Sequence, residues 1–146
     1  MDLKYRKFGR RDFDEYRSWY SDALLNEALG PAVDHEWLDY VLSDETGIQY
    51  VAILDERLVG TFGLVKPVPE FRFWALTDIA VNPEYRKQGI ASTILAALPE
   101  LTGTNQVVAF VMQNNKVAFE MFTRAGWLKD ESLHSDMYRF EMAAGP

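Results

Sequence analysis

The chain has 146 residues, 48% of them hydrophobic, and contains no cysteine. This length suits one domain with a core of its own rather than two, and the lack of cysteine excludes disulfides, thiolate metal sites and a cysteine nucleophile. The formal net charge of −7 disfavours nucleic acid as a partner, because a polyanion would be repelled at long range.

The N-terminal half of the chain predicts two helical segments followed by a β-hairpin. Its first residues are charged, unlike a signal peptide, and no apolar run approaches the ~20 residues that span a bilayer. We therefore expect a cytoplasmic protein with no membrane partner. The predicted elements are a strand at Leu3–Phe8, a helical segment with one break at Arg11–Leu29, a helix from an Asp34 N-cap to about Leu42, and strands at Gln49–Leu54 and Leu58–Val65.

These early helices are strongly acidic. No Lys or Arg occurs between Arg17 and Arg57, whereas nine carboxylates do. The segment therefore forms either solvated acidic outer faces or an electrostatic wall that attracts a cationic substrate. The nine residues are Asp22, Glu27, Asp34, Glu36, Asp39, Asp44, Glu45, Asp55 and Glu56.

The C-terminal half predicts strands that alternate with helices. The elements are a long strand at Phe71–Val81, a helix from Ile90 that Pro99 stops, a strand at Gln106–Met112, a helix from an Asn115 cap to Gly126, and last strands at Trp127–Lys129 and Met137–Met142. The inner face of the last helix is expected to be Val117, Ala118, Met121, Phe122 and Ala125. This order predicts one domain, residues 1–146, with a mixed, mostly antiparallel sheet of about seven strands and helices on both faces.

The stretch from Asp78 to Ser92 predicts an anion site. An apolar strand runs into a turn that contains Gly89, and a helix begins directly after it. The first backbone N–H groups of a helix lack intrahelical partners and lie at the positive end of its dipole. Arg86 and Lys87 add two cations there, and a glycine lets the backbone approach a phosphate closely. We expect the ligand to be a diphosphate.

Two motifs give the chain a family resemblance. Val81-Asn-Pro-Glu-Tyr-Arg86-Lys-Gln-Gly89-Ile-Ala91 resembles Arg/Gln-x-x-Gly-x-Gly/Ala, the acyl-CoA-binding motif of the GNAT superfamily of N-acetyltransferases. Asn115-Lys-Val-Ala118-Phe-Glu-Met-Phe122-Thr-Arg-Ala-Gly126-Trp127 resembles the family's second motif, Asn-x-x-Ala-x-x-x-Tyr-x-x-x-Gly-Phe. The resemblance implies a GNAT fold and transfer of an acetyl group from acetyl-CoA to a primary amine by direct attack in a ternary complex, without a metal.

The resemblance also implies which residues bind acetyl-CoA. The backbone of Ile79, Ala80 and Val81 would pair with the pantetheine arm like an added strand. Asn115 would hydrogen-bond that arm, although helix capping is an alternative role for it, and Ala118 and Phe122 would line it. The residues expected to cradle the pyrophosphate are Arg86, Lys87, Gln88, Gly89, Ile90, Ala91 and Ser92.

Phe122 departs from the family pattern. Many members have Tyr here, whose hydroxyl is thought to protonate the departing CoA thiolate. A positioned general acid contributes ~10²–10⁴-fold, but a thiol that titrates near ~8.5 can leave as the thiolate unaided. We therefore expect slower turnover rather than inactivity, with Tyr138 or Tyr85 as alternative acids.

The acceptor amine also has to lose a proton, since an alkyl amine with a pKa of ~10.4 is almost fully charged at neutral pH. Asp78 is the first candidate for the base because it is a carboxylate within an apolar strand. Strand alternation places it on one face with Leu76 and Ala80. Glu36 and His35 are the next candidates, and a chain of waters would leave no trace in the sequence.

The acceptor is harder to predict. Trp19, Tyr20, Trp37 and Tyr40 lie on the helices that form one wall of the acceptor groove in GNAT enzymes. Core packing is their default role, whereas an acidic and aromatic groove would suit a polyamine, an aminoglycoside or a lysine side chain. The alternatives are a protein lysine or N-terminal acetyltransferase and a catalytically weak acyl-CoA-binding sensor or partner-binding module. A homodimer is expected from the resemblance alone.

Overall fold

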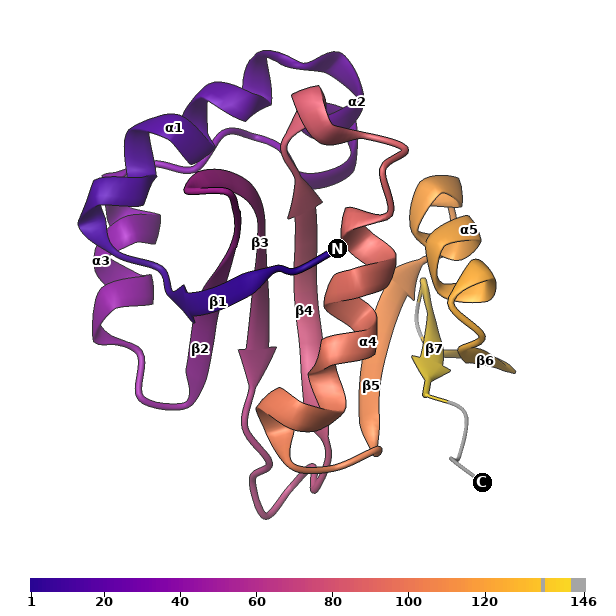
Figure 1. The fold of residues 1–146 in the computed structure, drawn as a ribbon. Coiled ribbons are helices and arrows are strands. Elements are labelled where there is room, and N and C mark those ends of the chain that lie inside the picture. Colours follow the sequence, from indigo (N-terminus) through magenta and orange to yellow (C-terminus); the bar gives the residue numbers. More distant parts are fainter. Residues whose placement is uncertain (135, 143–146) are drawn as a thin grey trace.

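The computed structural model describes residues 1–134 and 136–142 (Figure 1). Its strands form a seven-stranded sheet in the order β1-β2-β3-β4-β5-β7-β6. Every neighbouring pair is antiparallel except β4 and β5, which are parallel. The mixed, mostly antiparallel sheet expected from the sequence is confirmed. The strands are β1 Lys4–Lys7, β2 Gly47–Leu54, β3 Arg57–Val65, β4 Trp74–Val81, β5 Val107–Met112, β6 Leu128–His134 and β7 Met137–Glu141.

Helices cover both faces of this sheet, as predicted (Figure 1). One face carries α1 (Phe13–Ser18), α2 (Ala23–Leu29) and α3 (His35–Ser43), and the other carries α4 (Ile90–Thr102) and α5 (Lys116–Arg124). The segment predicted as one helix with a single break is divided further, because 3-10 turns η1 (Arg10–Asp12) and η2 (Trp19–Ser21) flank α1. A third turn, η3 (Pro83–Tyr85), follows β4.

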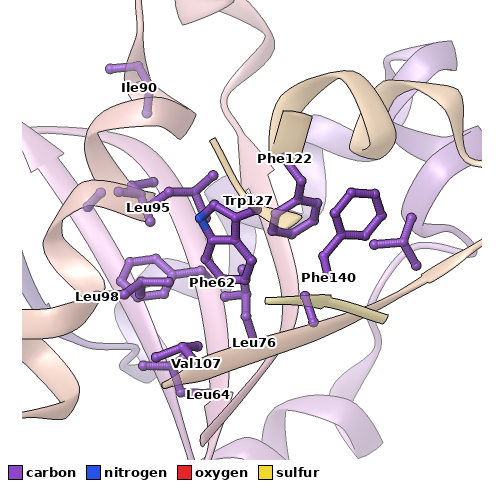
Figure 2. Close-up of a cluster of buried hydrophobic side chains, with 14 of the residues drawn as sticks. Phe62, Leu64, Leu76, Ile90, Leu95, Leu98, Val107, Phe122, Trp127 and Phe140 are labelled. Carbon is purple, nitrogen blue, oxygen red and sulfur yellow. The ribbon is translucent and has the colours of Figure 1, made fainter. Parts of the chain in front are cut away.

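Two apolar clusters hold these layers together. The cluster beneath α1–α3 includes Tyr16, Trp19, Tyr20, Leu25 and Leu38. The larger cluster beneath α4 and α5 is rich in aromatic rings, and Figure 2 shows three of them packed side by side. The Phe122 ring centroid lies 4.8 Å from that of Trp127 and 5.3 Å from that of Phe140.

Two predictions about the C-terminal helices were wrong. Pro99 does not stop α4, which continues to Thr102 until Gly103 ends it with φ +76°. Pro99 removes only one backbone donor, and buried Ile94, Leu95 and Leu98 hold the helix against the sheet. Val117 is 66% exposed and Ala125, the C-cap of α5, is exposed as well, so neither belongs to the inner face predicted for this helix.

The strand predicted from Phe71 begins only at Trp74. Backbone hydrogen bonds of 3.0 Å join Val68 and Phe71 in both directions and close a tight turn before the strand. The strand predicted at Trp127–Lys129 is longer than expected and runs from Leu128 to His134.

Candidate active site

The central strands β4 and β5 separate at one point. They pair only through Trp74–Leu76 and Val107–Ala109, so the carboxyl end of β4 has no partner on β5. The pairing of β4 with β3 also shifts here, because Gly63 lies opposite Asp78 while Leu64 lies opposite Leu76. Thr77 is thus the extra residue of a β-bulge, a feature that redirects side chains near active sites.

The bulge changes the face on which Asp78 lies. Leu76 packs in the cluster beneath α4 and α5, whereas Ala80 packs in the cluster beneath α1–α3. The prediction that Leu76 and Ala80 share a face was therefore wrong, because simple alternation does not hold through a bulge. Asp78 faces the acidic helices, together with Ala80.

Asp78 is held by two hydrogen bonds. Gln49 Nε2 donates to Asp78 Oδ2 at 3.0 Å, and Thr77 Oγ1 donates to Oδ1 at 2.9 Å. The Gln49 side chain also contacts Thr61 Oγ1 at 3.0 Å. Burial raises the pKa of the Asp78 carboxyl above its ordinary value, and the two hydrogen bonds only partly oppose this effect. A carboxylate with a raised pKa and a fixed orientation is suited to accept a proton near neutral pH.

A cavity of about 240 Å³ opens beside this carboxylate. Trp37, Tyr40 and Asp44 line it from α3 and the loop that follows, while Gln49 and Asp78 line it from the sheet. A hydrogen bond from the backbone N–H of Thr46, and a second from its side chain, lower the pKa of Asp44. The Asp44 carboxylate is therefore ionised at neutral pH. The cavity therefore combines two carboxylates with two aromatic rings.

The other two aromatic residues of the predicted wall are buried. Trp19 and Tyr20 are core residues, and the hydroxyl of Tyr20 lies 2.7 Å from that of Tyr16. Burial raises the pKa of both phenols, and the nearby charge of Asp78 raises each further. The phenols consequently stay neutral and form the inner layer behind the carboxylate.

The predicted anion site lies where α4 begins. Gly89 is the N-cap of α4 with φ +82°, and no side chain caps the helix. Lys87 also has a positive φ of +62°, and its side chain is exposed together with that of Gln88. A Cβ atom built at Gly89 would meet only Met1 Cε, at 4.0 Å. The uncapped N–H groups and the open space above Gly89 fit a diphosphate.

Arg86 makes a contact that the sequence did not predict. Its Nη1 donates to Asp22 Oδ1 at 3.0 Å, and its Nη2 donates to Asp22 Oδ2. The guanidinium is therefore paired with the N-cap residue of α2, while the backbone of Arg86 leads into the turn that forms the anion site.

The second motif is built around α5. Asn115 Oδ1 accepts a hydrogen bond from Ala118 N at 3.1 Å and caps the helix, which leaves the amide nitrogen of Asn115 for a second role. Ala118 is partly buried, whereas Phe122 is 2% exposed and belongs to the core (Figure 2). The roles predicted for these three residues in binding the pantetheine arm remain predictions.

The remaining candidate bases do not share the cavity. Glu36 is exposed on α3, and the His35 ring packs at 5.1 Å from that of Phe13. Neither residue is among those that line the cavity. The contacts of Gln49 and Gly63 with Asp78, and of Asp22 with Arg86, were not predicted from the sequence. A polar Gln49 at the start of an apolar strand was the one local signal.

Within residues 1–134 and 136–142, no group of three or more His, Asp or Glu could hold a metal ion. No helix in the described part of the chain is long and apolar enough to cross a membrane.

Residues 13–127 match the acetyltransferase (GNAT) family. A comparison with curated proteins found no match. Among solved structures, the fold is similar to the GNAT domain of S. lividans PAT, with a TM-score of 0.74 and 17% identity over 96% of this chain and 89% of that chain. It is also similar to spermidine N-acetyltransferase from Vibrio cholerae in complex with CoA and spermine, with a TM-score of 0.74 and 16% identity over 96% of this chain and 93% of that chain. A third similar structure is aminoglycoside acetyltransferase AAC(6')-Ib in complex with coenzyme A and kanamycin, with a TM-score of 0.77 and 16% identity over 97% of this chain and 95% of that chain.

The family match over residues 13–127 identifies the class of protein as an acetyltransferase. The chain belongs to the GNAT family of acetyltransferases and is an acetyl-CoA-dependent N-acetyltransferase.

Proposed function

We propose that this enzyme moves the acetyl group of acetyl-CoA to a primary amine of a small cationic molecule, by direct attack in a ternary complex. The observation that carries the proposal is the cavity beside Asp78, whose lining includes two carboxylates and two aromatic rings. Carboxylates and ring faces both attract ammonium groups. At about 240 Å³ the cavity suits a small molecule better than an extended peptide.

Acetyl-CoA would be held by the two motifs, and it supplies the thioester whose acetyl group is transferred. The turn from Arg86 to Ser92 would bind the pyrophosphate, and the free edge of β4 at Ile79–Val81 would pair with the pantetheine arm. A backbone N–H near Val81 would stabilise the oxyanion. The described strands belong to one sheet, which supports a single acetyltransferase domain over residues 1–146.

Asp78 is the base in this proposal. Its raised pKa brings it closer to neutral pH, where a base is most effective. The Asp78 carboxylate first takes a proton from the ammonium group of the acceptor and passes it to water, which frees the nitrogen lone pair. The neutral nitrogen then attacks the thioester carbonyl carbon. As the C–S bond breaks, CoA leaves as the thiolate and the second nitrogen proton passes to Asp78. Glu36, the second candidate, is exposed on α3 and lies outside the cavity lining.

No acid is required at Phe122. The CoA thiolate can leave unprotonated at neutral pH, since a thiol titrates near ~8.5. Tyr138 packs against Phe119 with ring centroids 5.6 Å apart, and Lys129 Nζ lies 4.7 Å from the Tyr138 ring. Tyr85 packs at the margin of the larger core cluster. Both therefore have structural roles.

Two structurally similar proteins are named as a spermidine N-acetyltransferase and an aminoglycoside acetyltransferase. Spermidine and aminoglycosides are both amines with several cationic groups. At 16% identity they support the fold, while the choice of acceptor depends on the cavity of this chain.

The decisive experiment measures thiol release from acetyl-CoA with a panel of polyamines, aminoglycosides, amino acids and basic peptides. We expect saturable release with a small polyamine or an aminoglycoside. Thiol release with basic peptides alone would contradict the small-molecule proposal and indicate a protein acetyltransferase. Tight CoA binding without release from any acceptor would favour a sensor.

A further inference from the structure

The pair between Asp22 and Arg86 joins two parts of the molecule that are 64 residues apart in sequence. Both carboxylate oxygens and both terminal guanidinium nitrogens take part. The two side chains are only 26% and 34% exposed, so water screens the pair less than an open surface bridge. Asp22 Oδ2 also accepts a hydrogen bond from Leu25 N at 3.0 Å. One carboxylate thus caps α2 and holds Arg86.

Arg86 stands at the entrance of the diphosphate site. The next residue, Lys87, already has the left-handed backbone of the turn, and α4 begins at Ile90. A guanidinium has five N–H donors, of which two bind Asp22. The others remain for a phosphate oxygen, so Arg86 can bind Asp22 and the diphosphate at the same time.

Asp22 does not line the acceptor cavity, but neighbouring residues link it to the cavity wall. It follows η2 directly, and η2 contains Tyr20, whose hydroxyl contacts that of Tyr16. The Tyr16 ring packs against Trp37 with centroids 5.6 Å apart, and Trp37 lines the cavity. A continuous set of contacts therefore leads from the diphosphate turn to the side of the cavity opposite the sheet.

We propose that Asp22 is a positioning residue that orients Arg86 toward the CoA diphosphate and couples occupancy of that site to helix α2 and the acceptor wall. The proposal rests on the proposed function for the identity of the ligand. Bound diphosphate fixes Arg86, and the planar pair transmits this constraint to the first turn of α2, because a bidentate Arg–carboxylate contact has little freedom to rotate. The cavity is then ordered before the amine enters.

The test compares three variants with the unmodified protein, with CoA alone as the ligand. In Asp22→Asn the pair loses its charge, but Asn remains a good N-cap for α2. Asp22→Ser, which also caps, guards against an effect peculiar to Asn. Glu84→Gln is the control, because it removes an exposed carboxylate two residues from Arg86 that pairs with exposed Arg57 at 3.6 Å.

Amide hydrogen exchange of residues 23–29 and CoA titration calorimetry give the readout. We expect CoA to slow exchange in α2 of the unmodified protein and of Glu84→Gln. In both Asp22 variants this CoA-dependent protection is lost, and CoA affinity falls by roughly three- to tenfold. Protection that persists in the Asp22 variants overturns the proposal. Tighter CoA binding in these variants also overturns it, since Asp22 would then compete with the phosphate for Arg86.

Neither readout needs an acceptor or turnover. If α2 exchange does not respond to CoA while amines still release thiol, the coupling is wrong and the proposed function stands. If CoA protects α2 as expected but no amine releases thiol, the coupling stands and the proposed acetyl transfer to a cationic amine fails.

Discussion

Gln49 on β2 reaches across β3 to the carboxylate of Asp78 on β4, with 3.0 Å between Nε2 and Oδ2. The two side chains meet above Gly63, which pairs with Gln49 on one side and Asp78 on the other. A Cβ at Gly63 would lie 2.5 Å from Asp78 Oδ1 and 2.7 Å from Gln49 Oε1, closer than real atoms approach. The missing side chain of Gly63 therefore makes the room in which the base is oriented.

We expect Gly63→Ala to impair catalysis more than folding. The methyl group must displace the Asp78 carboxylate, and a shift of about 1 Å at a reacting group can lower the rate by ~10²-fold. Initial rates of thiol release and the thermal midpoint would be measured together. Gly9→Ala is the control, because Gly9 has an ordinary φ of −121° and its Cβ would meet nothing closer than 3.8 Å. An unaltered rate in Gly63→Ala would show that the Asp78 orientation does not matter.

Asp78→Asn should lower the rate at pH 7 by roughly 10²–10⁴-fold, the usual contribution of a general base. The asparagine can still accept from Gln49, so the site should keep its shape. At about pH 9 more of the amine is already neutral, and the variant should lose less. Parallel pH–rate profiles of the two proteins would contradict the assignment of Asp78 as base.

The same variant should be more stable than the unmodified enzyme at neutral pH. Burial raises the pKa of Asp78 in the folded state, so the folded protein binds this proton more tightly than the unfolded chain does. The stability that Asp78 contributes is therefore fully present below the unfolded pKa of ~3.9 and is lost as the pH rises through the folded pKa. Thermal unfolding should show Asp78→Asn gaining stability at pH 7 and little at about pH 4.

Much of the fold could be predicted because its signals are local. Asp34 and Asn115 accept hydrogen bonds from Trp37 N and Ala118 N, as capping residues do, and the apolar runs became β2, β3 and β5. The predictions at Pro99 and Val117 were wrong because tertiary packing, rather than local sequence, determines where α4 ends and which side of α5 faces the sheet. Apolar contacts with the sheet carry α4 past Pro99, and α5 is rotated so that Val117 faces solvent.

The candidate site could be predicted only in part, for a similar reason. Asp78 and Gly89 stand out within their own segments, one as a carboxylate in an apolar strand and one as a glycine at a helix start. The partners of Asp78 and Arg86 lie 29 and 64 residues away, and neither pairing leaves a periodic trace. The bulge at Thr77, which decides the face of Asp78, depends on the register with β3.

Asp44→Asn should weaken the binding of diamines selectively. Asp44 lines the cavity and is kept ionised by Thr46, so it can hold the second ammonium group of an acceptor that reacts beside Asp78. We expect the KM for putrescine to rise roughly three- to tenfold, with butylamine unaffected. Asp39→Asn is the control, because Asp39 is exposed on α3 and lies outside the cavity lining. Equal changes in KM for putrescine and butylamine would show that Asp44 does not bind the second ammonium group of the acceptor.

Gly89→Ala should weaken acetyl-CoA binding by at least about tenfold, because its methyl group would stand where the diphosphate approaches the N-terminus of α4. Gly103→Ala is a matched control at the other end of the same helix. The two glycines have nearly equal backbone angles, φ +82° and +76° with ψ 14°, so both substitutions should cost a similar ~1 kcal/mol of stability. Calorimetry should find the loss of affinity in Gly89→Ala only. Equal affinities would refute the diphosphate cradle.

Phe122→Tyr tests whether a missing acid limits turnover. The ring is 2% exposed, stacks on Phe140 and packs at a tilt against Trp127 (Figure 2), so a hydroxyl without a partner would cost about 1–3 kcal/mol. We expect the variant to fold and its rate to rise less than ~tenfold, since the thiolate leaves unaided at neutral pH. Phe140→Tyr, at the adjacent core ring, should lose stability without any gain in rate. A gain of ~10²-fold or more in Phe122→Tyr alone would show instead that protonation of the thiolate limits this enzyme.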